Sequence, residues 1–255
     1  MKRSIAATLL TSIITVLAVP CFSQDTATLL QRVKTANVRG ALPQDVTISG
    51  TLTDDSGNTQ PIQMQIKGKD KIRTEIGTGK TRRITIFNGN QGWTQVGDQL
   101  QALPQHASVR RPSLIPMLDL LSEIDSPQLI AADRGLKAIG QQNARQISLT
   151  LPDPATVRAF GRKLDENLEV FIDPVSMLVV RTERLNRSME NMDFLIPSVL
   201  EFSDYRVVGN LAVAFRIVNT TGTPDIGMHQ KIMVISQVQL NTSIPDSAFL
   251  PGGAQ

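Results

Sequence analysis

The stretch "EIGTGKTRR", residues 75–83, contains the Gly-Lys-Thr triplet of a phosphate-binding loop. Such a loop also has a glycine at the start of the motif, a position that Thr74 holds here. The loop must lead directly into a helix, whose N-terminal N–H groups bind the phosphates. Residues 82–90, "RRITIFNGN", instead alternate like a strand and end in an Asn-Gly turn. We therefore predict that Gly77-Thr78-Gly79 forms a turn between two strands and that no nucleotide is bound.

The other side chains that could carry chemistry are two histidines and a group of carboxylates. His106 and His229 lie far apart, and neither has a second histidine one helical turn away, so a zinc site is not predicted. Spacing alone does not exclude a Ser-His-Asp triad, but the Gly-x-Ser-x-Gly motif of many hydrolases is absent. Glu166, Glu169 and Asp173 fall on both faces of an alternating segment beside a turn, and we interpret them as a solvated edge. We predict no metal, no cofactor and no enzymatic activity.

The first residues have the layout of a secretory signal peptide. Lys2 and Arg3 precede an uncharged apolar run over residues 5–19, and small residues follow. This run is shorter than the roughly 20 apolar residues that span a bilayer, which disfavours the alternative of an uncleaved anchor. We predict that residues 1–23 are a signal peptide, cleaved after Ser23.

Composition narrows the compartment and the partners of the remaining chain. The formal net charge of +3 includes Lys2 and Arg3, aromatic residues make up 4% of the chain, and no basic stripe is present, so nucleic acid is not a predicted partner. The only cysteine is Cys21, so the mature chain would have neither a disulfide nor a free thiol, which suits a bacterial periplasm. A lipid-modified Cys21 is the alternative that would place the protein on a membrane surface. Residues 24–255 are long enough for one large β domain.

Two segments have helical periodicity and are predicted to be short helices. In Thr26–Val38 the residues of the apolar face are Leu29, Leu30 and Val33. In Pro112–Ile124 they are Leu114, Met117, Leu118 and Leu121. Each helix has one apolar face, so each needs a sheet or another helix to cover it.

Most of the remaining chain alternates with a period of two between turn signals such as Gly209-Asn210. The predicted apolar faces of three such stretches are Ile62, Met64 and Ile66; Leu211, Val213, Phe215 and Ile217; and Ile232, Val234, Val238 and Leu240. Short strands joined by tight turns make an antiparallel meander. We predict a mainly β fold, an incomplete antiparallel β-barrel formed by a curled sheet and covered by a few short α-helices.

The order of these elements resembles that of the periplasmic lipoprotein-carrier (LolA-like) family. The segments that carry the resemblance are "GTLTDDSGNTQPIQMQI", "KIRTEI", "RITIFNGNQGWTQ", "PSLIPMLDLL", "LEVFIDPVSMLVVRTE" and "VQLNTSIPDSAFLPGG". The resemblance implies a single half-barrel domain over residues 24–255, helices that form a lid, and an interior that accepts the acyl chains of lipoproteins. Two features depart from the family. Lys67-Gly68-Lys69 lacks the Arg and Pro of the family's basic turn, and the hairpin "SDYRVVGNLAVAFRI" is absent from the shortest carriers.

We therefore expect a periplasmic carrier or binding protein for acyl chains or another amphiphile, with an inner- or outer-membrane protein as a further partner. The predicted ligand-binding residues are Met64, Ile66, Ile86, Trp93, Leu118, Val213, Phe215 and Val234. Among them, Leu118 would close over the site, and Trp93 would either pack in the core or line the mouth. A sensor or scaffold subunit that binds the apolar segment of a protein partner is the alternative.

Overall fold

A computed structural model describes residues 26–68, 70–89, 91–103, 124–125, 129–151, 166–187, 195–225 and 227–252. In these ranges the chain is mainly β, with one α-helix, α1 (Thr26–Asn37), and two short 3-10 helices, η1 (Gly79–Thr81) and η3 (Asp246–Phe249). The strands are β1 (Asp45–Thr53), β2 (Thr59–Lys67), β3 (Lys71–Ile76), β4 (Arg83–Asn88), β5 (Gln91–Val96), β6 (Gln99–Ala102), β7 (Ile130–Ile139), β8 (Gln142–Leu151), β9 (Glu166–Ile172), β10 (Val179–Arg187), β11 (Leu195–Val208), β12 (Leu211–Thr223) and β13 (Gly227–Leu240).

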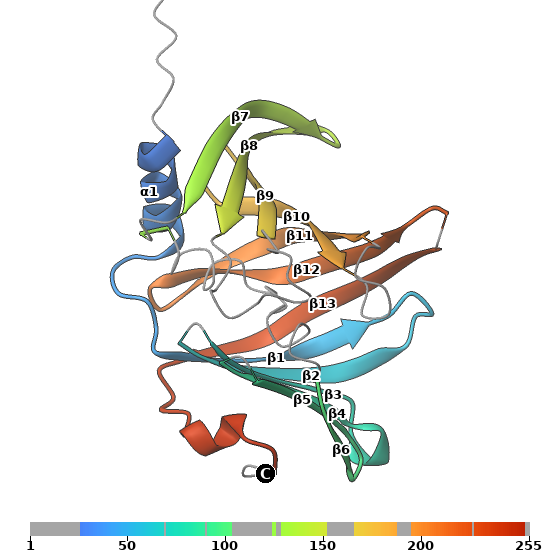
Figure 1. The fold of residues 1–255 in the computed structure, drawn as a ribbon. Coiled ribbons are helices and arrows are strands. Elements are labelled where there is room, and N and C mark those ends of the chain that lie inside the picture. Colours follow the sequence, from blue (N-terminus) through green and yellow to red (C-terminus); the bar gives the residue numbers. More distant parts are fainter. Residues whose placement is uncertain are drawn as a thin grey trace, which may run out of the picture.

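All 13 strands form one antiparallel sheet in the order β6-β5-β4-β3-β2-β1-β13-β12-β11-β10-β9-β8-β7. The sheet ends at β6 and β7, which do not pair with each other, so it does not close into a barrel. It bends, and its two arms, β1–β6 and β7–β10, stand on either side of the central strands (Figure 1). The predicted mainly β fold with an incomplete, curled antiparallel sheet is confirmed.

Helix α1 forms where the sequence predicts it and buries the predicted face, Leu29, Leu30 and Val33. It ends at Asn37, whose side-chain amide donates to the carbonyl oxygens of Val33 at 2.7 Å and Met177 at 3.1 Å. These hydrogen bonds tie the end of the helix to the turn between β9 and β10. No helix in the described part of the chain is long and apolar enough to cross a membrane. The second predicted helix, Pro112–Ile124, lies outside the described residues except for Ile124, which is buried.

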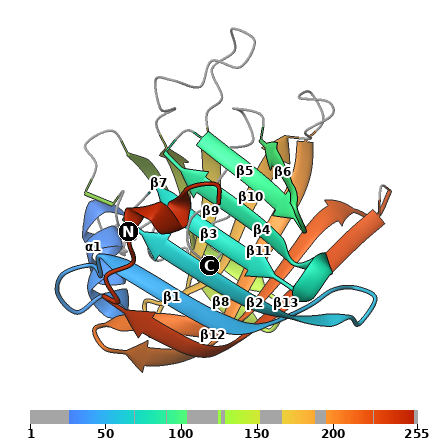
Figure 2. The same cartoon turned by 90° about the horizontal axis from the view of Figure 1, so that it is seen from below.

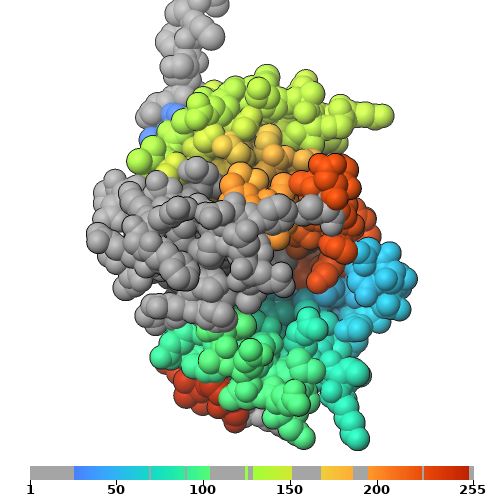
Figure 3. All heavy atoms as spheres, turned by 45° about the vertical axis from the view of Figure 1, so that its right-hand side comes forward, coloured from blue at the N-terminus to red at the C-terminus, as the bar shows by residue number. Residues whose placement is uncertain are grey.

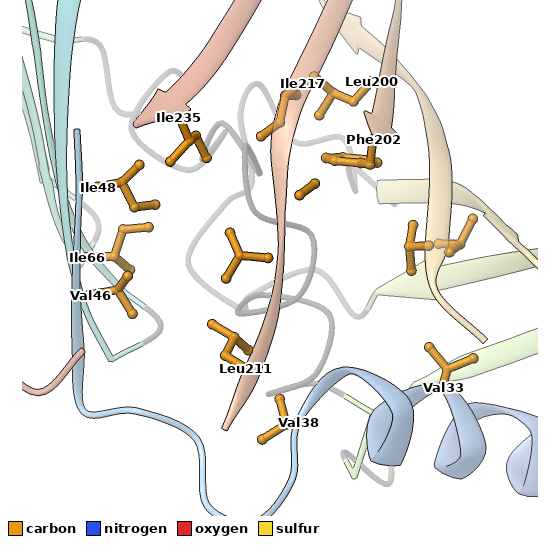
Figure 4. Close-up of a cluster of buried hydrophobic side chains, with 14 of the residues drawn as sticks. Val33, Val38, Val46, Ile48, Ile66, Leu200, Phe202, Leu211, Ile217 and Ile235 are labelled. Carbon is orange, nitrogen blue, oxygen red and sulfur yellow. The ribbon is translucent and has the colours of Figure 1, made fainter. Parts of the chain in front are cut away.

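The apolar face of the sheet that the arms enclose is here called the inner face. It is defined by the pairs Val46–Ile66 and Ile48–Met64 on β1 and β2, and it carries the main hydrophobic cluster of the molecule. Val46, Ile48 and Ile66 project into the same interior as Leu211 and Ile217 of β12 (Figure 4). Residues far apart in sequence thus share one apolar surface, as expected for a sheet that curls around its own inner side.

A second, smaller cluster lies on the opposite, outer face of β4 and β5. Its members are Ile84, Ile86, Ile244, Ala248 and Phe249, with Trp93 packed against them. The C-terminal segment brings three of these residues to the sheet, and η3 lies over β3 and β4 (Figure 2). The C-terminal segment therefore covers an apolar patch on the outer face of this arm.

Two hairpin tips meet at one side of the molecule. The β12–β13 tip lies beside the β1–β2 tip (Figure 3), and His229 Nδ1 lies 2.7 Å from Asp55 Oδ2. Both side chains are largely exposed, and the pKa of Asp55 is lowered chiefly by its hydrogen bond with His229. His229 is thus a surface residue, as predicted, and His106 lies outside the described residues.

Candidate binding surface

The inner face of β1–β3 is a continuous apolar wall. Met64 and Ile48 are opposite each other in the β1–β2 ladder, and both are 1% exposed. Ile66 pairs with Ile72 on β3, and both are also buried. The strands alternate here as the sequence predicts, so every second side chain points inward. The side chains between them point to the outer face, where Asp45 and Arg73 are buried.

The central strands and the other arm continue this wall. On β11 and β12, Phe202 pairs with Ile217, and both are buried in the same cluster as Met64. On β8 and β9 the buried members of that cluster are Ile147, Leu149, Val170 and Ile172. The inner face therefore runs from β3 to β8 as one apolar surface.

Two polar side chains near this surface, Tyr205 and Arg145, are paired. The Tyr205 hydroxyl donates to the carbonyl oxygen of Val179, and burial raises the pKa of Tyr205 well above its ordinary value, so it stays a donor. Arg145 donates to Asp133, and this hydrogen bond is the main cause that lowers the pKa of Asp133. Ligand binding at the inner face would rest on apolar contact, since these polar groups already have partners.

Four of the predicted ligand-binding residues are brought together by the fold. Met64, Ile66, Val213 and Phe215 are all buried members of the inner-face cluster. Phe215 also makes a cation–π contact with Arg206, whose guanidinium carbon lies 4.3 Å from the centre of the Phe215 ring. Leu118 lies outside the described residues.

Ile86 and Trp93 are placed elsewhere. They pair with each other in the β4–β5 ladder, and both belong to the outer cluster beneath the C-terminal segment. Grouping them with Met64 is therefore wrong in spatial terms, because the sheet separates the two sets. For Trp93 the structure supports packing in a core, the first of the two roles that the sequence left open.

Val234 is the clearest correction. It is 47% exposed, whereas its neighbours Met233 and Ile235 are buried in the inner-face cluster. The β1–β13 register shifts between Ser49 and Gly50, so β13 has one extra residue at this point. Such a bulge reverses which residues of a strand face inward. Val234 therefore does not share a face with Val238, and the prediction that it lines the binding surface is wrong.

The other candidate motifs are structural. The Gly-Lys-Thr triplet forms η1, between the antiparallel strands β3 and β4, and Lys80 is exposed, which confirms the predicted turn. Asp173 accepts hydrogen bonds from the backbone of Val175 and Ser176 in the β9–β10 turn. Glu169 accepts from Ser148 and Gln146. In the described part of the chain, no three His, Cys, Asp or Glu side chains are arranged to hold a metal.

Sequence reasoning missed the polar contacts that hold the C-terminal segment. Asp45, only 3% exposed, accepts from the backbone N–H of Thr242 at 2.6 Å and from that of Ile244 at 3.3 Å. Lys67 donates to the carbonyl oxygen of Ile244 at 2.7 Å and pairs with Asp246 at 2.8 Å. The signal lay in the basic run "KGKDKIR", but its partners are about 175 residues further along the chain.

Known proteins resemble this chain in structure but not detectably in sequence. No protein-family model matches the sequence, and no curated protein matches it significantly. A LolA superfamily protein from Nitrosomonas europaea is 12% identical with a TM-score of 0.55, and the match covers 88% of this chain and 97% of that one. An outer membrane lipoprotein-sorting protein domain from Vibrio parahaemolyticus is 10% identical with a TM-score of 0.56, over 88% of this chain and 95% of that one.

A third structure, a DUF1329 family protein from Desulfovibrio piger, is 11% identical with a TM-score of 0.55, over 90% of this chain and 97% of that one. At such identities the likeness concerns the path of the chain and not its side chains. The resemblance to the LolA-like family that the order of elements indicates is confirmed for the fold, and the chain has the fold of LolA superfamily structures.

Proposed function

We propose that this protein is an exported carrier that holds the acyl chains of a lipoprotein, or of another amphiphile, against the inner face of its sheet. The observation that carries the proposal is the inner-face cluster, spread over an antiparallel sheet that does not close. The neighbour described as a lipoprotein-sorting protein domain has the same fold, which supports this class of cargo.

Binding would need no covalent step. Burial of apolar area contributes about 25 cal/mol per Å2, or roughly 0.8 kcal/mol for each methylene group, so an acyl chain gains affinity with length. Met64 suits a surface that must accept chains of different shape, because its unbranched thioether adapts to its surroundings. We propose Met64, Ile66, Val213 and Phe215 as ligand-contacting residues.

The proposed site of action is the bacterial periplasm. Residues 1–23 would direct export and be removed after Ser23, and the mature chain would then contain no cysteine. A carrier of this kind receives and delivers its cargo at membranes, so we also propose an inner- or outer-membrane protein as a partner. N-terminal sequencing of the exported protein tests this, since an acylated Cys21 would instead place it on a membrane surface.

Native mass spectrometry of the purified mature protein is the direct test of cargo. An added mass that matches a lipid or acyl chain, lost on delipidation, supports the proposal. Titration of the delipidated protein with the fluorescent fatty acid cis-parinaric acid should then show saturable binding. A co-purified peptide with no lipid would favour the alternative sensor or scaffold role, and absence of both masses together with absence of binding would contradict the carrier proposal.

A matched pair of variants tests which surface binds. Ile66→Asn and Ile86→Asn make the same change at buried positions, one on the inner face and one in the outer cluster. The side-chain amide of the new asparagine would find no hydrogen-bond partner on a hydrocarbon chain, and this costs roughly 1–3 kcal/mol of binding free energy. Ile66→Asn should therefore weaken cis-parinaric acid binding by about tenfold or more. Ile86→Asn should lower the melting temperature and leave the affinity unchanged. Equal loss of affinity in two variants that still melt cooperatively would contradict the assignment of the inner face.

A further inference from the structure

The sheet splits between its two central strands. The β12–β13 ladder runs from Thr223–Gly227 to Arg216–Val234 and then stops, although both strands continue. Residues 211–215 of β12 form no ladder with β13 and run beside β11, and Leu211 also makes an isolated bridge to Val38. Residues 235–240 of β13 run beside β1. The two strands diverge toward the α1 end of the molecule (Figure 1). This unpaired region, 211–215 against 235–240, is here called the split.

Irregularities in both neighbouring ladders coincide with the start of the split. On one side, the β1–β13 register shifts at Ser49 and Gly50, opposite Ile235. On the other, the β11–β12 ladder skips the pair between Asp204 and Phe215, and Asp204 has a positive φ of 54°. The start of the split thus coincides with a bulge in the β1–β13 ladder and with one unpaired position, in unchanged register, in the β11–β12 ladder.

The side of the split that faces the interior is apolar. Leu211, Val213, Phe215 and Ile235 belong to the inner-face cluster, and Val238 and Leu240 pack against it, whereas Ser236, Gln237 and Gln239 are exposed. Residues 211–215, "LAVAF", are all buried, so this part of β12 is covered on both faces, whereas most other strands alternate. Residues 235–240, "ISQVQL", likewise contain no charge, whereas the joined part of the ladder includes Arg216 and Lys231. At the end of the split the two sides lie close together, since a Cβ added to Gly209, in the turn before β12, would lie 3.1 Å from Leu240 Cδ1.

A short segment crosses the open end of the split. This segment, residues 39–44, connects α1 to β1 and is here called the strap. At its start, the N–H of Arg39 donates to the carbonyl oxygen of Asn210 at 2.8 Å, and the Asn210 side chain donates to the carbonyl oxygen of Ala41. At its end, the N–H of Gln44 donates to the side-chain oxygen of Asn241 at 2.8 Å. Asn210 precedes β12 and Asn241 follows β13, so the strap is fastened on both sides of the split.

We infer that the split, covered by the strap, is the route by which an acyl chain reaches the inner face; this inference rests on the proposed function. Separating any other two neighbouring strands of the sheet requires breaking a backbone ladder, but here only side-chain contacts and the hydrogen bonds of the strap must yield. The occupant is an unbranched hydrocarbon chain, because the side of the split that faces the interior is apolar and neither segment carries a charge. The strap then acts as a gate, and uptake is limited by its release.

Cross-linking Val38, the residue that directly precedes the strap, to β12 tests the gate, because the cross-link holds the first end of the strap at the split. Val38 and Leu211 face each other in an isolated antiparallel bridge, a geometry within reach of a disulfide. The double variant Val38→Cys/Leu211→Cys, in a Cys21→Ser background, is compared with Thr53→Cys/Thr59→Cys, whose positions pair in the β1–β2 hairpin away from the split. Stopped-flow mixing with cis-parinaric acid measures uptake before and after reduction.

We expect oxidation to slow uptake by about tenfold or more in the strap variant, to leave the hairpin variant unchanged, and to be reversed by reduction. Unaltered uptake in an oxidised strap variant that melts cooperatively overturns the gate while leaving the carrier proposal intact. Wild-type protein that never binds the probe overturns both.

A second variant gives a change of opposite sign and does not disturb the core. Asn210→Ala removes the side-chain hydrogen bond to Ala41 and should speed uptake severalfold. Asn58→Ala, in the exposed turn of the β1–β2 hairpin, is the matched control. Equal uptake rates in Asn210→Ala, Asn58→Ala and wild type would argue against the strap as the gate.

Discussion

A Cβ atom on Gly50 would lie 2.2 Å from the carbonyl oxygen of Val234, at the point where β1 crosses the bulge in β13. No side chain other than hydrogen fits so close to a backbone oxygen. Glycine is therefore needed at position 50 because the two backbones approach so closely at this bend, and not because the position has an unusual backbone conformation. The same bend carries Val234 to the outer face.

Gly50→Ala should therefore destabilise the protein by about 1–3 kcal/mol or more, because the backbone of β13 must shift to admit the methyl group. Urea unfolding of purified protein measures the change. Thr51→Ala, an exposed position next to it on β1, should stay within about 0.5 kcal/mol of wild type. A Gly50→Ala variant as stable as Thr51→Ala would show that the close approach can relax without cost.

The bulge also shows how far the sequence can predict this fold. Period-two alternation placed Met64 and Ile66 on one face correctly, because β1–β3 pair without interruption. It failed at Val234, because an inserted residue leaves no local trace in an apolar strand. The apolar runs of β12 and β13 also look alike in the sequence, although residues 211–215 of β12 are buried on both faces and β13 is buried on one.

The outer cluster was unpredictable for a different reason. The alternation of "RITIFN" shows that Ile84 and Ile86 share a face but does not say which face of the sheet this is. The answer depends on Ile244 and Phe249, which reach the sheet from the far end of the chain. Contacts with a segment so far along the chain leave no signal in the local sequence. The sequence therefore places Ile86 and Trp93 on the inner face, whereas they lie in the outer cluster.

Asp45 should make the stability of the protein depend on pH. Burial raises the pKa of Asp45, but hydrogen bonds from Thr242, Ile244 and Ser243 outweigh this and lower it below the ordinary value. A carboxyl group with a lowered pKa in the folded state stabilises that state above its unfolded pKa of about 3.9 and loses this contribution as the pH falls through the folded value. The stability difference between wild type and Asp45→Asn should therefore be constant near neutral pH and shrink below about pH 4.

Chemical unfolding at a series of pH values measures this difference. Asp98→Asn, at an exposed position between β5 and β6, serves as the control and should follow wild type throughout. A difference between wild type and Asp45→Asn that persisted undiminished into strong acid would mean that the ionised carboxylate is not what holds the C-terminal segment.

Lys80 should be dispensable. It is exposed within η1, and the segment that follows is β4 rather than a helix, so no cradle for a phosphate exists around it. Lys80→Ala should change the free energy of unfolding by no more than a few tenths of a kcal/mol and should leave fatty-acid binding unaltered. Equilibrium binding of a fluorescent ATP analogue tests the alternative of a nucleotide site. If the analogue bound to wild type and not to Lys80→Ala, the interpretation of Gly-Lys-Thr as a structural turn would be contradicted.

Phe249 should hold the C-terminal segment against the sheet, and Trp93 should report its position. Phe249 is 0% exposed in the outer cluster, and Trp93, the only tryptophan of the chain, packs against that cluster. Phe249→Ala leaves a cavity that costs about 3–5 kcal/mol, which exceeds what the hydrogen bonds of a short surface segment can offset. The segment should then detach from β4 and β5, and the tryptophan emission should shift to longer wavelength as water reaches the indole.

Emission spectra recorded below the unfolding transition separate this local release from global unfolding. Leu250→Ala, next to Phe249 but 47% exposed, should leave the emission where it is in wild type. Fatty-acid binding gives the second readout. The outer cluster and the inner face lie on opposite sides of the sheet, so Phe249→Ala should alter the emission of Trp93 while cis-parinaric acid still binds. If the affinity fell in step with the emission shift, the two faces of the sheet would be coupled, and the C-terminal segment would belong to the binding machinery.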